Sequence, residues 1–187
     1  MSSSVMPDSL SPQYALVAYV RNALGQFVEE LRRELHPAHA HLPAHVTVLP
    51  PRLLLGSESE AVEMLREYCA PVKPFEVAMG EVASFVPTTP TVFLRVAHAA
   101  YRLRELHDLL NRDVLVCHEP LPYMPHVTIG KMDTMERARE VFEISSERWD
   151  HYLGPHRFQV EELSFVRGSG CEWHDLATVT LGHGRKS

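Results

Sequence analysis

The 187-residue sequence predicts an α+β fold: a single domain of two lobes, with mostly antiparallel sheets around a central cleft. Stretches with the pattern of strands alternate with stretches of helical periodicity, and the order β-α-β-α-β occurs twice. Corresponding points are almost equally spaced: residues 14 and 91 begin the first strands, residues 45 and 126 are histidines, and residues 75 and 157 begin later strands. We therefore expect one domain over residues 13–184, with pseudo-twofold halves at about 13–88 and 89–184.

The first half opens with Tyr14–Val20, an apolar run that is typical of a buried central strand. Phe27, Leu31 and Leu35 then recur every four residues among charged residues, which predicts a helix. Pro37 should end that helix, because the residue before a proline avoids the α region.

The first half continues with a strand, a helix and a longer strand. The strand lies within residues 43–50 (PAHVTVLP) and stops at the proline pair 50–51. Ser57 to Glu60 has the Ser-x-x-Glu form of a capping box, so a helix should begin there. Its apolar face comprises Val62, Leu65, Cys69 and Val72. The longer strand runs from Phe75 to about Phe85.

The second half repeats this order and adds one strand at its end. The predicted elements are a strand at Thr91–Val96, a helix around Leu103, Leu106 and Leu110, a strand at His126–Ile129, a helix from Asp133 to about Arg148, a strand at Phe158–Arg167 and a last strand near Leu176–Leu181.

Both halves contain a strand with the pattern His-x-Thr. Residues 45–48 read His-Val-Thr-Val and residues 126–129 read His-Val-Thr-Ile. Because strand residues two apart share a face, His45 lies beside Thr47 and His126 beside Thr128, with branched apolar residues on the opposite face. One such pattern would be chance, whereas two in corresponding places indicate a site. We expect the two strands to form the two sides of one active site.

These four side chains suit the hydrolysis of a phosphodiester. In-line displacement puts attacker and leaving group on opposite sides of phosphorus, so a general base and a general acid should face each other. Two histidines meet that requirement without a metal, because the unperturbed imidazole pKa of about 6.5 lies close to working pH. Each threonine hydroxyl can donate to a non-bridging phosphoryl oxygen. The pattern leaves open which histidine is the base and which is the acid.

The pair of motifs, about eighty residues apart, resembles the two H-h-[T/S]-h motifs of the 2H phosphoesterase superfamily. Within it the chain looks most like the bacterial and archaeal group of 2′-5′ RNA ligases and cyclic phosphodiesterases. The resemblance implies a two-lobed fold with the motif strands across a central cleft. It also implies a phosphoric diester hydrolase that acts without a metal on 2′,3′-cyclic phosphates or 2′-5′ linkages of RNA, with His45, Thr47, His126 and Thr128 at the motif positions.

Two basic residues near the motifs are expected to bind the substrate. Lys131 lies five residues after His126, where members of the superfamily often have a basic residue, and could neutralise the phosphate. Arg52 directly follows the first motif strand and is a candidate phosphate partner. Arg95 and Arg167 are further candidates, and spacing alone does not choose among the three arginines.

Aromatic residues near the expected strand ends could stack on a base of the substrate. We expect Tyr123, two residues before the second motif's proline, to do so. Phe85 and Trp173 are alternatives. Aromatic residues at strand ends also pack in protein cores, so stacking is only one of two roles for each.

Two other functions stay open. The same fold could hold an RNA end or a nucleotide without turnover, although an intact His and Thr in both halves favour an enzyme. Residues 36–45 contain four histidines, which invites a metal site. Their spacing matches no helix-borne pair or finger and prolines interrupt the segment, so we expect a loop at the border of the cleft and no metal.

Composition limits partners and location. A formal net charge of -6 argues against binding long nucleic acid, which needs many basic contacts, and leaves a small nucleotide or RNA end as the partner. Cys69, Cys117 and Cys171 are far apart and suit a reducing compartment. No apolar run approaches the roughly 20 residues of a membrane span, and no signal-peptide pattern opens the chain. We expect a cytoplasmic monomer without a cofactor, and a disordered segment at residues 1–12.

Overall fold

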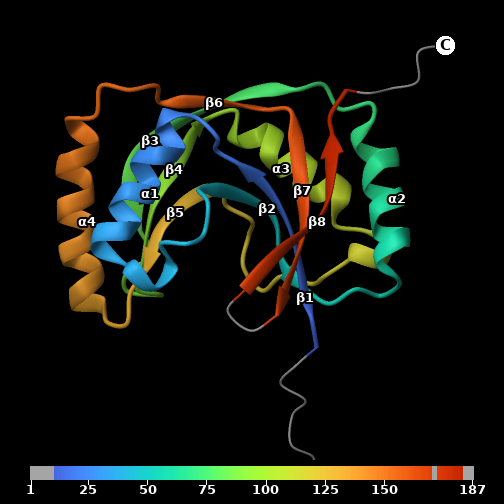
Figure 1. Cartoon of the computed structure of the whole chain (residues 1–187), viewed down its shortest axis with the longest axis horizontal. Helices are drawn as coiled ribbons and strands as arrows, with labels where there is room; N and C mark the ends of the chain where they lie inside the picture. Colours follow the sequence, from blue (N-terminus) through green and yellow to red (C-terminus); the bar gives the residue numbers. More distant parts are fainter. Residues whose placement is uncertain (1–10, 170–171, 183–187) are drawn as a thin grey trace, which may run out of the picture.

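Eight antiparallel strands join into one curled sheet in the computed structural model, which describes residues 11–169 and 172–182 (Figure 1). The strands are β1 (Gln13–Tyr19), β2 (His45–Arg52), β3 (Phe75–Ser84), β4 (Thr91–His98), β5 (His126–Lys131), β6 (Arg157–Val160), β7 (Glu162–Ser169) and β8 (Glu172–Thr180). Their order across the sheet is β6-β3-β4-β5-β2-β1-β7-β8. The predicted α+β class is confirmed, and the two His-x-Thr strands, β2 and β5, lie side by side at the centre of the sheet.

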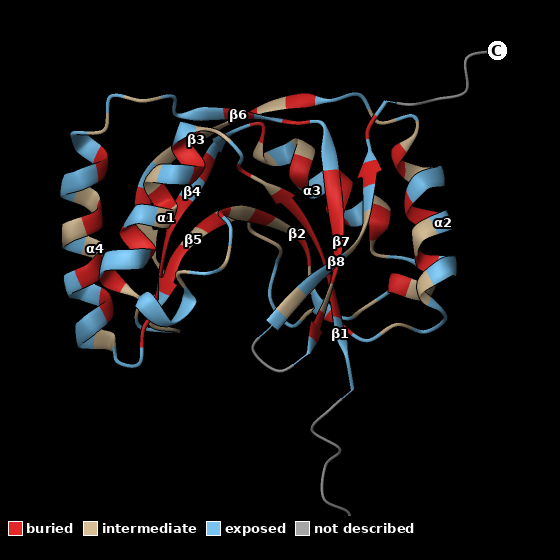
Figure 2. Ribbon diagram, viewed as in Figure 1, coloured by how far each residue is buried: buried red, intermediate tan, exposed pale blue. Residues whose placement is uncertain are grey.

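Four helices pack on the sheet. They are α1 (Ala23–Leu35), α2 (Glu58–Cys69), α3 (Ala100–Leu110) and α4 (Met135–Asp150), and two short 3₁₀ turns, η1 (Pro37–His39) and η2 (Asp113–Leu115), follow α1 and α3. The buried residues of α2 and α4 face the sheet and the exposed ones face outward (Figure 2). This is the amphipathic pattern on which the helix predictions rest.

Two lobes make up the molecule, and each contains segments of both sequence halves. One lobe consists of β6, β3, β4 and β5 with α1 and α4, and the other of β2, β1, β7 and β8 with α2 and α3. Helix α1 thus packs against β5 of the second half, while α3 packs against β2 of the first half. This exchange holds the two His-x-Thr strands together from both sides.

The stretch predicted as one strand at Phe158–Arg167 is two strands, because it changes partner. β6 pairs with β3 at one edge of the sheet, and after Glu161 the chain continues as β7, which pairs with β1 near the other edge. One continuous stretch therefore joins the two lobes across the top of Figure 1. The last strand also begins earlier than Leu176, because β8 pairs with β7 from Glu172 onward.

The helix ends follow the local sequence. The side chain of Ser57 accepts from the backbone N–H of Glu60 and the side chain of Glu60 accepts from that of Ser57, so the predicted capping box at the start of α2 is confirmed. Helix α1 ends before the proline, as predicted. Helix α4 begins two residues after Asp133, because the hydroxyl of Thr134 caps it by accepting from the N–H of Arg137.

The core anchors both motif strands by their apolar face. Val46, Val48, Val127 and Ile129 are each at most 1% exposed. The histidines and threonines of the same strands are half-buried on the opposite face. Burying a branched side chain of this kind contributes roughly 1.5–3 kcal/mol, so the strands are fixed from behind while their polar face stays accessible.

Some expectations fall partly or wholly outside the described residues. Residues 1–10 of the N-terminal segment and Cys171 belong to the part that the structure does not describe. Cys69 is buried, and burial raises the pKa of its thiol to about 12. Within the described ranges no helix has both the length and the apolar character that crossing a membrane requires.

Candidate active site

The polar faces of β2 and β5 meet at the centre of the sheet. The two strands are registered at the antiparallel pair Val46 and Val127. Continuing that register by one residue on each side places His45 opposite Thr128 and Thr47 opposite His126. The two histidines therefore lie at diagonal corners of one four-residue patch, as a pseudo-twofold relation between the halves requires.

Each histidine ring is oriented by a carbonyl two residues earlier in the chain. Nδ1 of His45 lies 2.7 Å from the carbonyl oxygen of Pro43, and Nδ1 of His126 lies 2.7 Å from that of Met124. Because a carbonyl oxygen only accepts, Nδ1 is the donor in both rings and carries the proton. Nε2 is thus left on both rings as the atom available for proton transfer.

The surroundings favour the neutral form of both imidazoles. Burial lowers the pKa of His45 to about 4, with smaller contributions from the charges of Arg32 and His126 and an opposing one from the hydrogen bond to Pro43. Burial also lowers the pKa of His126, against the hydrogen bond to Met124.

Side chains from outside the central pair of strands hold the carbonyl groups of both motif threonines. The hydroxyl of Tyr123 donates to the carbonyl oxygen of Thr47 at 2.8 Å. Arg32 donates to that of Thr128 through Nη2 at 2.6 Å and Nε at 3.2 Å, and through Nη1 to the carbonyl oxygen of Leu42 at 2.6 Å. Only one residue pair registers β2 with β5, so these donors replace ladder bonds that a longer pairing would supply.

A cavity of about 770 Å³ opens over this patch. Its lining includes His45, Thr47 and Thr128 from the motifs. The loop before β2 forms one border, and β1, β7 and β8 form another. His126 is not among the described lining residues, and the rings of Phe85 and Phe93 pack against it at centroid distances of 5.4 and 4.9 Å. The cavity therefore lies mainly on the His45 side of the site.

A β-bulge turns Lys131 to the cavity, whereas Arg52 stays on the core face that strand alternation gives it. The pairing of β4 with β5 shifts by one residue at Ile129, which turns Lys131 to the face of His126 and into the lining of the cavity. The pairing of β1 with β2 shifts twice before Arg52, which pairs with Tyr14 on the core face. Of the two, the structure places only Lys131 at the cavity.

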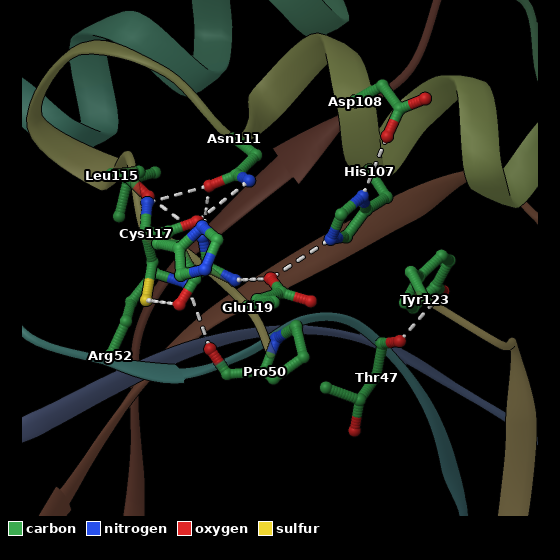
Figure 3. A network of polar contacts seen from close by, with 11 residues as sticks. Thr47, Pro50, Arg52, His107, Asp108, Asn111, Leu115, Cys117, Glu119 and Tyr123 are labelled. Atoms are coloured by element: carbon green, nitrogen blue, oxygen red, sulfur yellow. Dashed lines mark hydrogen bonds and ion pairs between the residues drawn. The ribbon is translucent and has the colours of Figure 1, made fainter. Parts of the chain in front are cut away.

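Arg52 instead ties the end of β2 to the loop after α3 (Figure 3). Its side chain is 1% exposed and Nη2 lies 2.6 Å from Oε1 of Glu119. Nη1 donates to Oδ1 of Asn111 and to the carbonyl oxygen of Leu115. With its guanidinium enclosed in this way, Arg52 is not placed to meet a substrate.

Tyr123 also lies away from the cavity. Its ring stacks on His107 at a centroid distance of 4.3 Å, and its hydroxyl points to the backbone of Thr47 (Figure 3). Phe85 packs against His126 rather than facing the cavity. Among the aromatic residues considered as stacking partners, the structure brings only Trp173 to the cavity.

Arg32 is the functional candidate that the sequence pattern did not single out. It is 3% exposed, lines the cavity, and contacts the backbone of Thr128 and Leu42. Burial lowers its pKa only to about 10, so it stays charged at neutral pH. Its position in the sequence could have indicated this burial, because Arg32 lies four residues after Val28 and thus on the buried side of α1.

The histidine-rich loop borders the cavity, as expected. His39 and His41 contribute to the lining, and His36 packs against His39 at a centroid distance of 4.4 Å. Across the residues that the structure describes, no three His, Cys, Asp or Glu side chains are grouped as ligands of a metal ion would be.

Comparisons with known proteins give one consistent result. Residues 20–171 match the family model of the 2′-5′ RNA ligase superfamily. A protein of Oceanobacillus iheyensis that is provisionally named a phosphoesterase is 23% identical over 163 residues, which are 75% of this chain and 95% of that protein.

Solved structures share the fold at low sequence identity. The structure of E. coli LigT complexed with 3′-AMP has a TM-score of 0.58 and 13% identity, and the match covers 91% of this chain and 98% of LigT. Kluyveromyces marxianus Usb1 has a TM-score of 0.54 and 17% identity, with 90% of this chain and 98% of Usb1 covered.

Proposed function

The chain belongs to the 2′-5′ RNA ligase superfamily of 2H phosphoesterases, and on that premise we propose that it is a metal-independent phosphodiesterase. Its substrates are the 2′,3′-cyclic phosphates or 2′-5′ phosphodiesters of small nucleotides and RNA ends. The observation that carries the proposal is the register of β2 with β5, which brings two His-x-Thr patterns together on one face.

The two imidazoles act as a general base and a general acid. For a 2′,3′-cyclic phosphate, Nε2 of the neutral ring takes a proton from water as its oxygen bonds to phosphorus. The protonated ring gives its proton to the ribose oxygen as the bond between that oxygen and phosphorus breaks. The product is a phosphomonoester. Since Nδ1 of each ring is held by a carbonyl, both Nε2 atoms keep their orientation during the exchange of protons.

Hydroxyl and ammonium groups stabilise the charge on the phosphoryl oxygens. Thr47 and Thr128 line the cavity from the two strands, and their hydroxyl groups can donate to the two non-bridging oxygens of the phosphate. Lys131, exposed at the border of the cavity, adds a positive charge. LigT, which shares the fold, has been crystallised with phosphate and with 3′-AMP, which supports a phosphate-bearing ligand for this chain.

A substrate panel tests the proposal. Purified protein is incubated, with and without EDTA, with nucleoside 2′,3′-cyclic phosphates, RNA ending in a cyclic phosphate, 2′-5′-linked oligonucleotides and ADP-ribose cyclic phosphate. Phosphorus NMR then identifies the bond that breaks. We expect at least one of these compounds to be hydrolysed at the same rate in EDTA.

Binding without turnover would point to the other candidate, a protein that holds an RNA end. Binding is therefore measured in parallel, and single-turnover conditions reveal slow chemistry. If the compounds bind while no bond breaks in the wild-type protein, the proposed hydrolase activity is wrong.

A further inference from the structure

A second, small apolar cluster lies on the cavity face of the sheet. Ala15, Val17 and Val166 are buried together there, apart from the main core, and Tyr19 and Trp173 pack against them. All five line the cavity that contains His45. Because this cluster faces the cavity and lies apart from the main core, it is not needed to hold the sheet to its helices.

The cluster forms a shallow floor, with the aromatic rings of Trp173 and Tyr19 beside it. Ala15 and Val166 face each other across β1 and β7, and their side chains are too short to project far from the sheet. Trp173 lies across from Gly168 in the pairing of β7 with β8. A β-carbon on Gly168 would lie 2.9 Å from the indole, so the glycine makes the room in which the ring sits.

The same cavity also has polar residues in its lining. Thr47, Thr128 and Lys131 lie toward the proposed phosphate position, and Glu172 and His174 lie beside the indole at the rim. Two aromatic rings pack against His126, and the cavity extends on the side of His45, where the floor offers the organic part of a substrate an apolar surface. The cavity of about 770 Å³ lies within the range found for small-molecule sites.

We propose that Trp173 and the floor of Ala15, Val17 and Val166 form the nucleobase site, with the base stacked on the indole and the phosphate at His45. The proposal rests on the proposed function and narrows its substrate class to nucleotides whose base adjoins the reacting ribose phosphate. A flat aromatic ring stacks on an indole whatever its hydrogen-bonding pattern, so the site selects for a base and tolerates different bases.

A pair of substrates isolates the contribution of the base. Adenosine 2′,3′-cyclic phosphate and methyl ribofuranoside 2,3-cyclic phosphate have the same ribose and phosphate, and only the first has a base. In Trp173→Ala we expect kcat/KM to fall about 10-fold or more for the nucleotide, in line with measured base stacking. The compound without a base should be hydrolysed as by wild type. Tyr101→Ala, which removes a 60% exposed aromatic residue from α3, is the matched control and should change neither.

A second variant displaces the indole without removing it. In Gly168→Ala the added methyl group must push the indole ring away. We therefore expect a smaller fall in kcat/KM, again for the nucleotide and not for the compound without a base. Equal losses for both substrates in either variant, or no loss for the nucleotide in Trp173→Ala, would overturn the proposal.

A binding measurement separates this proposal from the proposed activity. 3′-AMP should quench the tryptophan fluorescence of the wild type, inorganic phosphate should not, and Trp173→Ala should lose the response. Quenching by 3′-AMP in a protein that hydrolyses no cyclic phosphate would support the base site while refuting the activity. If the wild type hydrolyses cyclic nucleotides and Trp173→Ala hydrolyses them at the same rate, the proposed activity is supported and the base site is refuted.

Discussion

The surroundings of His45 and His126 share the same local backbone geometry and differ in almost everything else. Each ring binds the carbonyl oxygen of the residue two positions earlier, and each histidine lies opposite the threonine of the other motif strand. Each motif strand also has a bulge directly after its own threonine. His45 borders an open cavity near Arg32, whereas His126 packs against two phenylalanine rings. The two strands therefore share the ring orientation that the proposed proton transfer needs, and they differ in what surrounds each ring.

The carbonyl groups of the two threonines show the same contrast at smaller scale. On β2, a neutral hydroxyl, that of Tyr123, donates to the carbonyl oxygen of Thr47. On β5, a charged guanidinium, that of Arg32, donates to the carbonyl oxygen of Thr128 and also to the loop before β2. Both groups hold a threonine carbonyl in place, but only the guanidinium is charged. Replacing Arg32 and replacing Tyr123 should therefore have different effects on stability and on the pH profile.

The largest expected effect tests whether the two histidines are equivalent. His45→Ala and His126→Ala should each lower kcat on a cyclic phosphate by roughly 10²–10⁴-fold, because each removes one proton-transfer partner. The double variant should be little worse than either single one, since the two act as a unit. Steady-state kinetics with circular dichroism as a check on folding would measure this. A single variant with wild-type activity would contradict the paired mechanism.

The pH dependence of kcat/KM follows from the two lowered pKa values. The active free protein has one neutral and one protonated imidazole, so kcat/KM peaks between the two macroscopic pKa values. Both lie below the ordinary 6.5, and that of His45 is about 4, so the maximum should fall between about pH 4 and 6.5.

Outside that range kcat/KM should fall about tenfold per pH unit, on the acid side because both rings are protonated and on the alkaline side because both are neutral. A bound phosphate anion raises the pKa of both rings, so the maximum of kcat should lie at higher pH than that of kcat/KM. A kcat/KM maximum above pH 7 would contradict the assignment.

Local patterns in the sequence were enough to predict the motif strands and their two faces. Alternation placed Val46 and Val127 in the core, and the capping box located the start of α2. The role of Arg52 was different: alternation places it on the face of Val46 and Val48, but its partners Asn111 and Glu119 lie about 60 residues away in the chain. Distant partners leave no period in the sequence, and neither does a bulge such as the one that turns Lys131 to the cavity.

The break between β6 and β7 shows a second limit of pattern reading. Residues 157–169 look like one strand because apolar residues recur on both sides of the break, but the alternation slips by one residue at Glu161 and Glu162, where the partner changes from β3 to β1. Periodicity reports which face is buried and does not report against which strand. For the same reason the stacking role expected for Tyr123 could not be separated from its contact with the backbone of Thr47.

Arg32→Gln should change both stability and the acid limb of the pH profile. Loss of its charge-assisted bonds to two carbonyl groups should lower the free energy of unfolding by about 1.5–3 kcal/mol. The positive charge of Arg32 helps to lower the pKa of His45, so its removal should raise that pKa and move the acid limb to higher pH.

Arg33→Gln removes an exposed charge from the next position of α1 and is the matched control for Arg32→Gln. Chemical denaturation and an NMR titration of His45 would measure the two effects. An unchanged His45 titration in Arg32→Gln would show that the guanidinium acts on the backbone alone.

The smallest effect should come from Tyr123→Phe, which removes only the donor to Thr47. The ring can stay stacked on His107, so the free energy of unfolding should fall by about 1 kcal/mol, the value of one hydrogen bond. If the hydroxyl positions β2 for catalysis, kcat should fall a few-fold with KM unchanged, because the hydroxyl of Thr47 then meets the phosphoryl oxygen less well as charge develops. A lower melting temperature with an unchanged kcat would assign the bond to stability alone. Arg32 also binds the loop before β2, so Arg32→Gln should change KM. Tyr123→Phe should leave KM unchanged, and this difference would distinguish the roles of the two donors.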